Sequence, residues 1–148
     1  MAGQSYRDLV VWQKAMQLVT KTYSVADTFP KSEMFGLASQ LKRAAISVPS
    51  NIAEGQGRDS MKEFLHHLSI AYGSLMEVET QIQIAANLSF IPQTQADTLI
   101  DKCGEVGRLL NGLLRSLRNQ PTDNRQPATK TYESIQTSRR ASRLFILW

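Results

Sequence analysis

The sequence of 148 residues is poor in the groups that hold small folds together covalently or through metals. Its single cysteine, Cys103, excludes an internal disulfide and a cysteine-based zinc site. No apolar run approaches the roughly 18 residues that a membrane span requires. The first eight residues also lack the apolar core of a signal peptide. We therefore expect a soluble, cytoplasmic protein that does not enter a membrane.

What the chain does have is a seven-residue apolar rhythm that occurs four times. Steps of three and four place each run on one stripe of a helix. The runs are Leu9, Trp12, Met16, Val19, Tyr23 and Ala26; Met34, Leu37, Leu41, Ala44 and Val48; Met61, Phe64, Leu68, Ala71, Leu75, Val78, Ile82 and Ala85; and Leu99, Cys103, Val106, Leu110, Leu113 and Leu117. Strand alternation is absent. Residues 1–118 are therefore predicted to form an all-α, antiparallel up-down-up-down four-helix bundle.

The predicted helices have recognisable ends. Ser5 begins a capping-box pattern before the first helix, and Ser60 begins another before the third. Ser32 is the expected N-cap of the second helix. Pro49 lies inside that helix, where we expect a kink rather than a stop, and Gly55 lies near its end.

Residues 119–148 form a tail of different composition, rich in Asn, Gln, Pro and Thr at its start, and are expected to be disordered. The tail then carries Arg139, Arg140 and Arg143, followed by the apolar residues 144–148. This end is either a peptide that binds a partner, a membrane surface or a nucleic acid, or a segment without function.

The net charge of +4 indicates an acidic partner such as RNA or DNA, but most of it belongs to the tail. Residues 1–118 carry a net charge of only +1. Within the bundle, the outermost heptad positions of the first and fourth helices are basic: Arg7, Lys14, Lys21, Arg108 and Arg115. Because the first and last helices of such a bundle are neighbours, these side chains would form a basic wall that neutralises phosphates. The alternative is ordinary solvated cations.

Several outer positions are apolar and predict an oligomer interface, since one bundle core cannot use them all. They are Val11, Leu18, Val25, Ile46, Ile70, Met76 and Ile84. The alternative is that they are scattered surface residues.

The sequence gives little support for enzyme catalysis or for a metal site. A di-iron bundle requires Glu-x-x-His on two helices, facing inward. Here the pattern occurs once, at Glu63 and His66, on positions that point outward. Cys103 falls on a core stripe. We expect no enzyme activity, no cofactor and no metal site.

A polar block interrupts the second apolar run at Ser47, Pro49, Asn51, Glu54 and Gly55. Asn51 occupies an inward position, so its amide needs a hydrogen-bond partner. Glu54 is expected to pair with Arg43 or Arg58. The block is expected to be structural, with ligand binding as the alternative.

The sequence resembles the bacterial 23S ribosomal RNA intervening-sequence proteins from about residue 6 to residue 117. The most distinctive match is the block Ser47–Gly55, Ser-Val-Pro-Ser-Asn-Ile-Ala-Glu-Gly. Further matches are Asp8–Ala15, Phe29-Pro30, Gln40, Arg43-Ala44, Glu63–Leu65 and Gly73–Glu77.

The resemblance implies a four-helix bundle that assembles into a homopentamer. It also implies a relation to the accessory variability determinants of diversity-generating retroelements, which bind a reverse transcriptase and nucleic acid. We therefore expect a non-enzymatic, oligomeric accessory factor that binds RNA or DNA. The alternative is a protein-interaction scaffold, such as a reverse-transcriptase accessory subunit.

Overall fold

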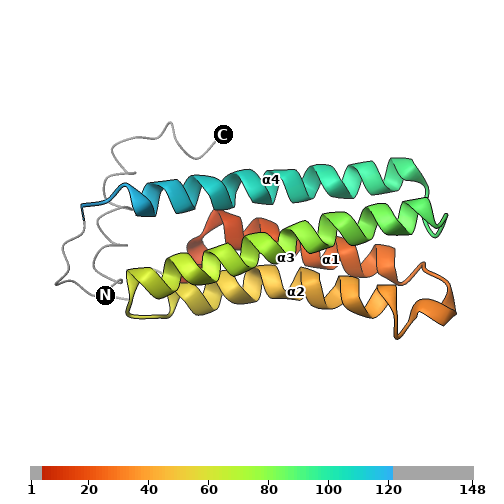
Figure 1. The fold of residues 1–148 in the computed structure, drawn as a ribbon, viewed down its shortest axis with the longest axis horizontal. Helices are drawn as coiled ribbons and strands as arrows, with labels where there is room; N and C mark the ends of the chain where they lie inside the picture. Colours follow the sequence, from red (N-terminus) through yellow and green to blue (C-terminus); the bar gives the residue numbers. More distant parts are fainter. Residues whose placement is uncertain (1–4, 122–148) are drawn as a thin grey trace.

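The computed structural model describes residues 5–121, and within them it contains helices and no strand. Four long helices alternate in direction, and α1 lies beside both α2 and α4 (Figure 1). The all-α, up-down-up-down prediction is confirmed. The elements are the 3-10 turns Tyr6–Asp8 and Lys31–Glu33 and the helices α1 Val10–Ala26, α2 Leu37–Gln56, α3 Met61–Asn87 and α4 Gln93–Arg118. None of these helices is both long and apolar enough to cross a bilayer.

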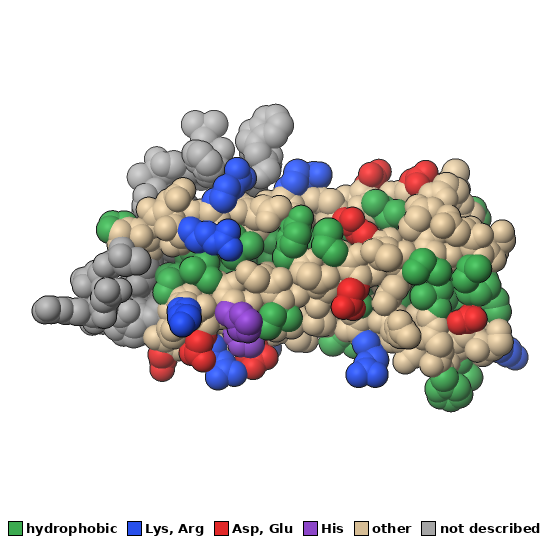
Figure 2. Space-filling model, viewed as in Figure 1, with side chains coloured by type: hydrophobic (Ala, Val, Ile, Leu, Met, Phe, Trp, Pro, Cys, Tyr) green, Lys and Arg blue, Asp and Glu red, His purple; other side chains and the backbone are tan. Residues whose placement is uncertain are grey.

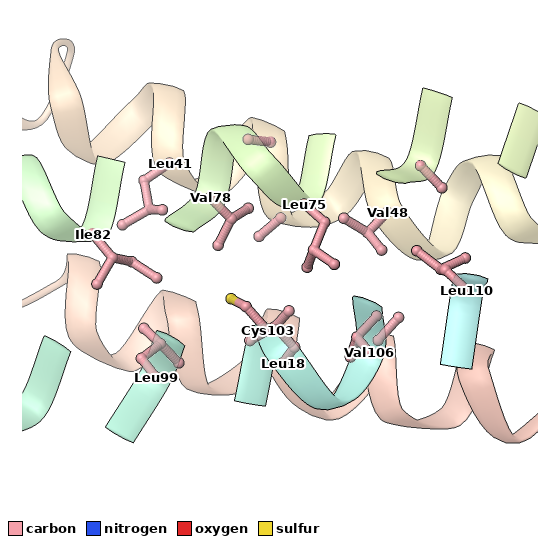
Figure 3. Close-up of a cluster of buried hydrophobic side chains, with 14 of the residues drawn as sticks. Leu18, Leu41, Val48, Leu75, Val78, Ile82, Leu99, Cys103, Val106 and Leu110 are labelled. Atoms are coloured by element: carbon pink, nitrogen blue, oxygen red, sulfur yellow. The ribbon is translucent and has the colours of Figure 1, made fainter. Parts of the chain in front are cut away.

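Each long helix contributes an inward apolar stripe to one continuous core. The predicted stripes of α3 and α4 are confirmed almost residue by residue. Leu75 and Val78 of α3 face Cys103 and Val106 of α4 across the core (Figure 3). Burying such side chains contributes roughly 1.5–3 kcal/mol each to folding.

The predicted register of α1 is wrong. Its buried side chains are Val11, Ala15, Leu18, Thr22, Val25 and Ala26. Leu18 points into the core beside α4 (Figure 3) and is only 1% exposed, whereas Met16 is 42% exposed. Val11, Leu18 and Val25, expected at an oligomer interface, are therefore core residues of the single chain.

The misassignment has a physical reason. α1 carries two apolar stripes, and the outward one holds the larger side chains, Trp12, Met16 and Tyr23. The inward stripe contains Ala15 and Thr22, which look weak in the sequence but are fully buried. Because these two side chains are small, α1 can pack closely against its neighbours without overfilling the core.

The start of α2 also differs from the prediction. Ser32 is not an N-cap, because it lies within a 3-10 turn and α2 begins only at Leu37. The Glu33 carboxylate accepts a hydrogen bond from the Leu37 backbone N–H at 3.1 Å and satisfies the first turn instead. Met34, predicted in the core, is consequently 58% exposed. Pro49 lies within α2 without ending it, as expected.

The corrected register of α1 predicts unequal costs for two truncations. Leu18→Ala should lower the free energy of unfolding by about 2–5 kcal/mol, because it empties part of a packed core. Met16→Ala should cost less than about 1 kcal/mol, because the side chain is largely in water. Urea unfolding followed by circular dichroism measures both. Equal costs would contradict the register.

Candidate functional site

The block Ser47–Gly55 builds a chain of hydrogen bonds across the contact between α2 and α3, the largest helix contact in the bundle. The hydroxyls of Ser47 and Ser74 lie 2.8 Å apart. The Asn51 amide nitrogen donates to the Ser47 carbonyl at 2.9 Å and to its hydroxyl at 3.0 Å. The Asn51 amide oxygen lies 3.0 Å from Nδ1 of His67. The expectation that Asn51 needs a partner is confirmed.

These contacts also fix the orientation of the His67 ring. Because the Asn51 amide nitrogen is committed to Ser47, its oxygen faces His67, so Nδ1 of His67 donates the hydrogen bond. The other ring nitrogen, Nε2, lies 4.0 Å from the Glu54 carboxylate. A protonated His67 would therefore pair with Glu54.

The sequence left the ion-pair partner of Glu54 open between Arg43 and Arg58. Glu54 pairs with Arg58, one helical turn later, at 2.8 Å, and not with Arg43. The hydrogen bond from Arg58 lowers the pKa of Glu54 below its ordinary value, and the nearby charges of His67 and Arg58 act in the same direction. Glu54 is therefore ionised at neutral pH.

Gly55, the last residue of the block, lies where α2 and α3 approach each other closely. A Cβ atom built on Gly55 would lie 2.6 Å from Cβ of His67 and 3.0 Å from the Phe64 ring. Only glycine allows α2 and α3 to approach this closely. With the close approach and the linked polar side chains together, the block is a structural clamp between two helices.

The predicted basic wall is interrupted. Lys14 of α1 forms an ion pair with Glu105 of α4 at 3.0 Å, so one of its charges is already matched. Lys21 of α1 and Arg7 of the preceding 3-10 turn are exposed. The guanidinium of Arg7 stacks over the Tyr6 ring at 5.6 Å from the ring centre. α1 therefore contributes less free positive charge than the sequence indicates.

The outer face of α4 divides into two halves of opposite charge. Arg108 and Arg115 are exposed as predicted, and the structure adds Arg118 one turn further on. None of these arginines forms an ion pair with a carboxylate of residues 5–121. Asp97 and Asp101 occupy the other half (Figure 2). Arg118 was missed although it lies three residues after Arg115.

The outward stripe of α1 forms an apolar groove with α2. Val19 and Tyr23 lie beside Ile46, which is 42% exposed, around a shallow hollow of about 420 Å³. Its other lining residues are Thr20, Ser24 and Asp27. We call this the α1–α2 groove. It was not predicted, because Val19 and Tyr23 were assigned to the core.

The other predicted interface residues lie on α3. Ile70 and Ile84 are exposed on its outer face, while Met76 is half-buried between α3 and α4. Ile46 lines the α1–α2 groove, whose lining includes no residue of α3.

The residues that the sequence analysis considered for catalysis and metal binding are Cys103, Glu63 and His66. Burial and the nearby charge of Glu79 raise the pKa of Cys103 to about 12, so its thiol stays protonated. Glu63 and His66 are both exposed. Within residues 5–121, no three His, Cys, Asp or Glu side chains come close enough to hold a metal ion. Arg139, Arg140 and Arg143 lie outside the described residues.

The clamp predicts a specific cost for losing Asn51. Asn51→Ala should lower the free energy of unfolding by about 1–3 kcal/mol, because it leaves the largely buried His67 without its acceptor. Ser50→Ala, at the next exposed position, should change it by less than about 0.5 kcal/mol. Thermal and urea unfolding measure both. If Asn51→Leu matched the wild type, packing and not hydrogen bonding would hold this contact.

A solved protein structure has a fold similar to this one. A crystal structure of a protein of unknown function from the S23 ribosomal protein family of Bacteroides thetaiotaomicron superposes with a TM-score of 0.67 at 21% sequence identity. The match covers 71% of this chain and 98% of that one. A search of curated proteins found no match. The model of the 23S rRNA-intervening sequence protein family matches residues 7–112, which include the clamp and most of the bundle, and the chain therefore belongs to that family.

Proposed function

We propose that the chain is a non-enzymatic, self-associating protein that binds the phosphate backbone of RNA or DNA. The observation that carries the proposal is the set of three exposed arginines on α4, Arg108, Arg115 and Arg118, without a carboxylate partner in residues 5–121. Guanidinium groups suit this role because they present several N–H donors to phosphate oxygens.

The arrangement of charge matters more than its total. Arg108 and Arg115 lie seven residues apart, which is about 10 Å along a helix, and Arg118 continues the same face. Such a row contacts a backbone without reading bases. Lys21 of α1, Arg7 of the preceding 3-10 turn and the tail arginines 139, 140 and 143 are further cations that could add phosphate contacts.

The first test concerns these arginines. Arg108→Ala/Arg115→Ala/Arg118→Ala should weaken binding of single-stranded RNA in a gel-shift titration. The slope of log affinity against log salt should fall by about 2, because roughly 0.7 of a counterion is released per phosphate contact.

A matched variant removes three exposed cations elsewhere, as Lys31→Ala/Arg43→Ala/Lys62→Ala, and should keep the wild-type slope. An Arg139→Ala/Arg140→Ala/Arg143→Ala variant measures the contribution of the tail. Equal binding by the α4 variant and the wild type would remove the bundle from the interface. Purified protein free of absorbance from bound nucleic acid and unable to shift RNA would favour a protein-interaction scaffold.

Self-association is proposed at the α1–α2 groove. Val19, Tyr23 and Ile46 line the hollow, and Met16, one turn before Val19 on α1, is also exposed. Exposed apolar surface of this kind is typical of subunit interfaces. A homopentamer is the assembly that the family resemblance implies.

The groove predicts the effect of charge on assembly. Met16→Glu/Ile46→Glu should lower the mass measured by multi-angle light scattering to that of a monomer, because carboxylates would be buried without partners. Ile70→Glu/Ile84→Glu adds the same charge on α3 and should leave the mass unchanged. A monomeric wild type at micromolar concentration would overturn the proposed assembly.

A reverse-transcriptase accessory role is the second candidate. The observation that favours a protein partner is the loop between α1 and α2, where Phe35 is 90% exposed and Met34 lies beside it in the chain. Leu88, in the loop between α3 and α4 at the same end of the bundle, is also exposed (Figure 1). Aromatic and Met side chains are enriched where proteins bind each other.

A further inference from the structure

The groove between α3 and α4 has a half that is both apolar and acidic. Apolar side chains line the gap between the two helices, and carboxylates flank it on both (Figure 2). We call this region the acidic groove; its apolar residues are the half-buried Tyr72, Met76 and Ile100, and its carboxylates are Glu79, Asp97 and Asp101.

The carboxylates of the acidic groove lack cations. No lysine or arginine of residues 5–121 forms an ion pair with any of them, although Asp97 accepts a hydrogen bond from the Gln93 amide at 2.8 Å. Partial burial raises the pKa of Glu79, which means that its charged form is poorly compensated. A cationic segment would therefore bind here with favourable electrostatics.

Two glycines of α4 lie beside the groove. A Cβ atom built on Gly104 would meet only the side chain of Arg108, and one built on Gly107 would touch Leu75 and Tyr72. Because both positions are glycine, the wall that α4 presents toward α3 is low at this level. Tyr72, Met76 and Ile100 keep part of their surface exposed at this level.

The chain itself contains a segment of complementary chemistry. Arg139, Arg140 and Arg143 provide three positive charges, and Leu144, Phe145, Ile146, Leu147 and Trp148 follow them. The connecting residues 122–138 number 17 and can span up to about 56 Å. Ile100 lies 18 residues before Arg118, or about 27 Å back along α4, so the segment can reach it.

We propose that residues 139–148 dock in the acidic groove of their own chain. The three arginines pair with the carboxylates, and the apolar residues cover Tyr72, Met76 and Ile100. The α1–α2 groove is the poorer match, because its one carboxylate, Asp27, already pairs with Lys42. The proposal does not rest on nucleic-acid binding, but a docked segment would withhold its three arginines from the row on α4.

The test uses Trp148 as a reporter in the full chain. Trp12→Phe leaves it as the only tryptophan. Acrylamide should quench Trp148 several-fold less efficiently in the chain than in a synthetic peptide of residues 139–148, because the groove shields it. The quenching should not depend on protein concentration, since the contact is made within one chain.

Two variants in this background locate the contact. Glu79→Gln/Asp97→Asn/Asp101→Asn should raise the quenching to that of the free peptide, and so should Met76→Glu/Ile100→Glu. Met16→Glu/Ile46→Glu, in the competing groove, should leave it unchanged. Circular dichroism confirms that each variant is folded, and the charge-removing variant serves if the apolar one unfolds.

Three results would overturn the proposal. One is quenching of Trp148 equal to that of the peptide in the unmodified groove. Another is exposure caused by the α1–α2 variant and not by the acidic-groove variants. The third is shielding that grows with protein concentration, which would place the segment on another copy.

Discussion

The contact between α2 and α3 is the constraint on which the other helix positions depend. Helices that meet only through apolar side chains can slide past one another by a turn at little cost, whereas buried polar partners tolerate one register. Here Asn51 has its partners only if Ser47 and His67 lie at their observed levels. Gly55 sets how closely the two axes approach. α1 and α4 then pack on a pair whose register is already determined.

The sequence was sufficient for the helices with a single apolar stripe and insufficient for the helix with two. α3 and α4 offered one way to face the core, so periodicity identified it. α1 offered two, and side-chain size pointed to the wrong one, because Ala15 and Thr22 contribute by being small enough to fit. Which of the two stripes faces the core depends on how α2 and α4 pack against α1. The sequence of α1 alone does not contain that information.

The same limit applies to the surfaces. Exposure of Arg108 and Arg115 followed from their heptad positions, which depend on one helix alone. The neutralisation of Lys14 by Glu105 joins residues 91 positions apart, so it could not be read from spacing. The α1–α2 groove could be recognised only once the register of α1 showed that Val19 and Tyr23 face outward. Properties of a single helix were predictable, and properties shared by two were not.

The opposite charges at the two halves of α4 give this helix an electrical polarity along its length. Asp97 and Asp101 lie in the N-terminal half of α4, and Arg115 and Arg118 lie in its last turn, where the helix dipole favours positive charge. The field of a polyanion exerts a torque on such a molecule. Under the proposed function, this torque would turn the arginine half of α4 forward before contact, so that a nearly neutral bundle would meet a charged surface in one preferred orientation.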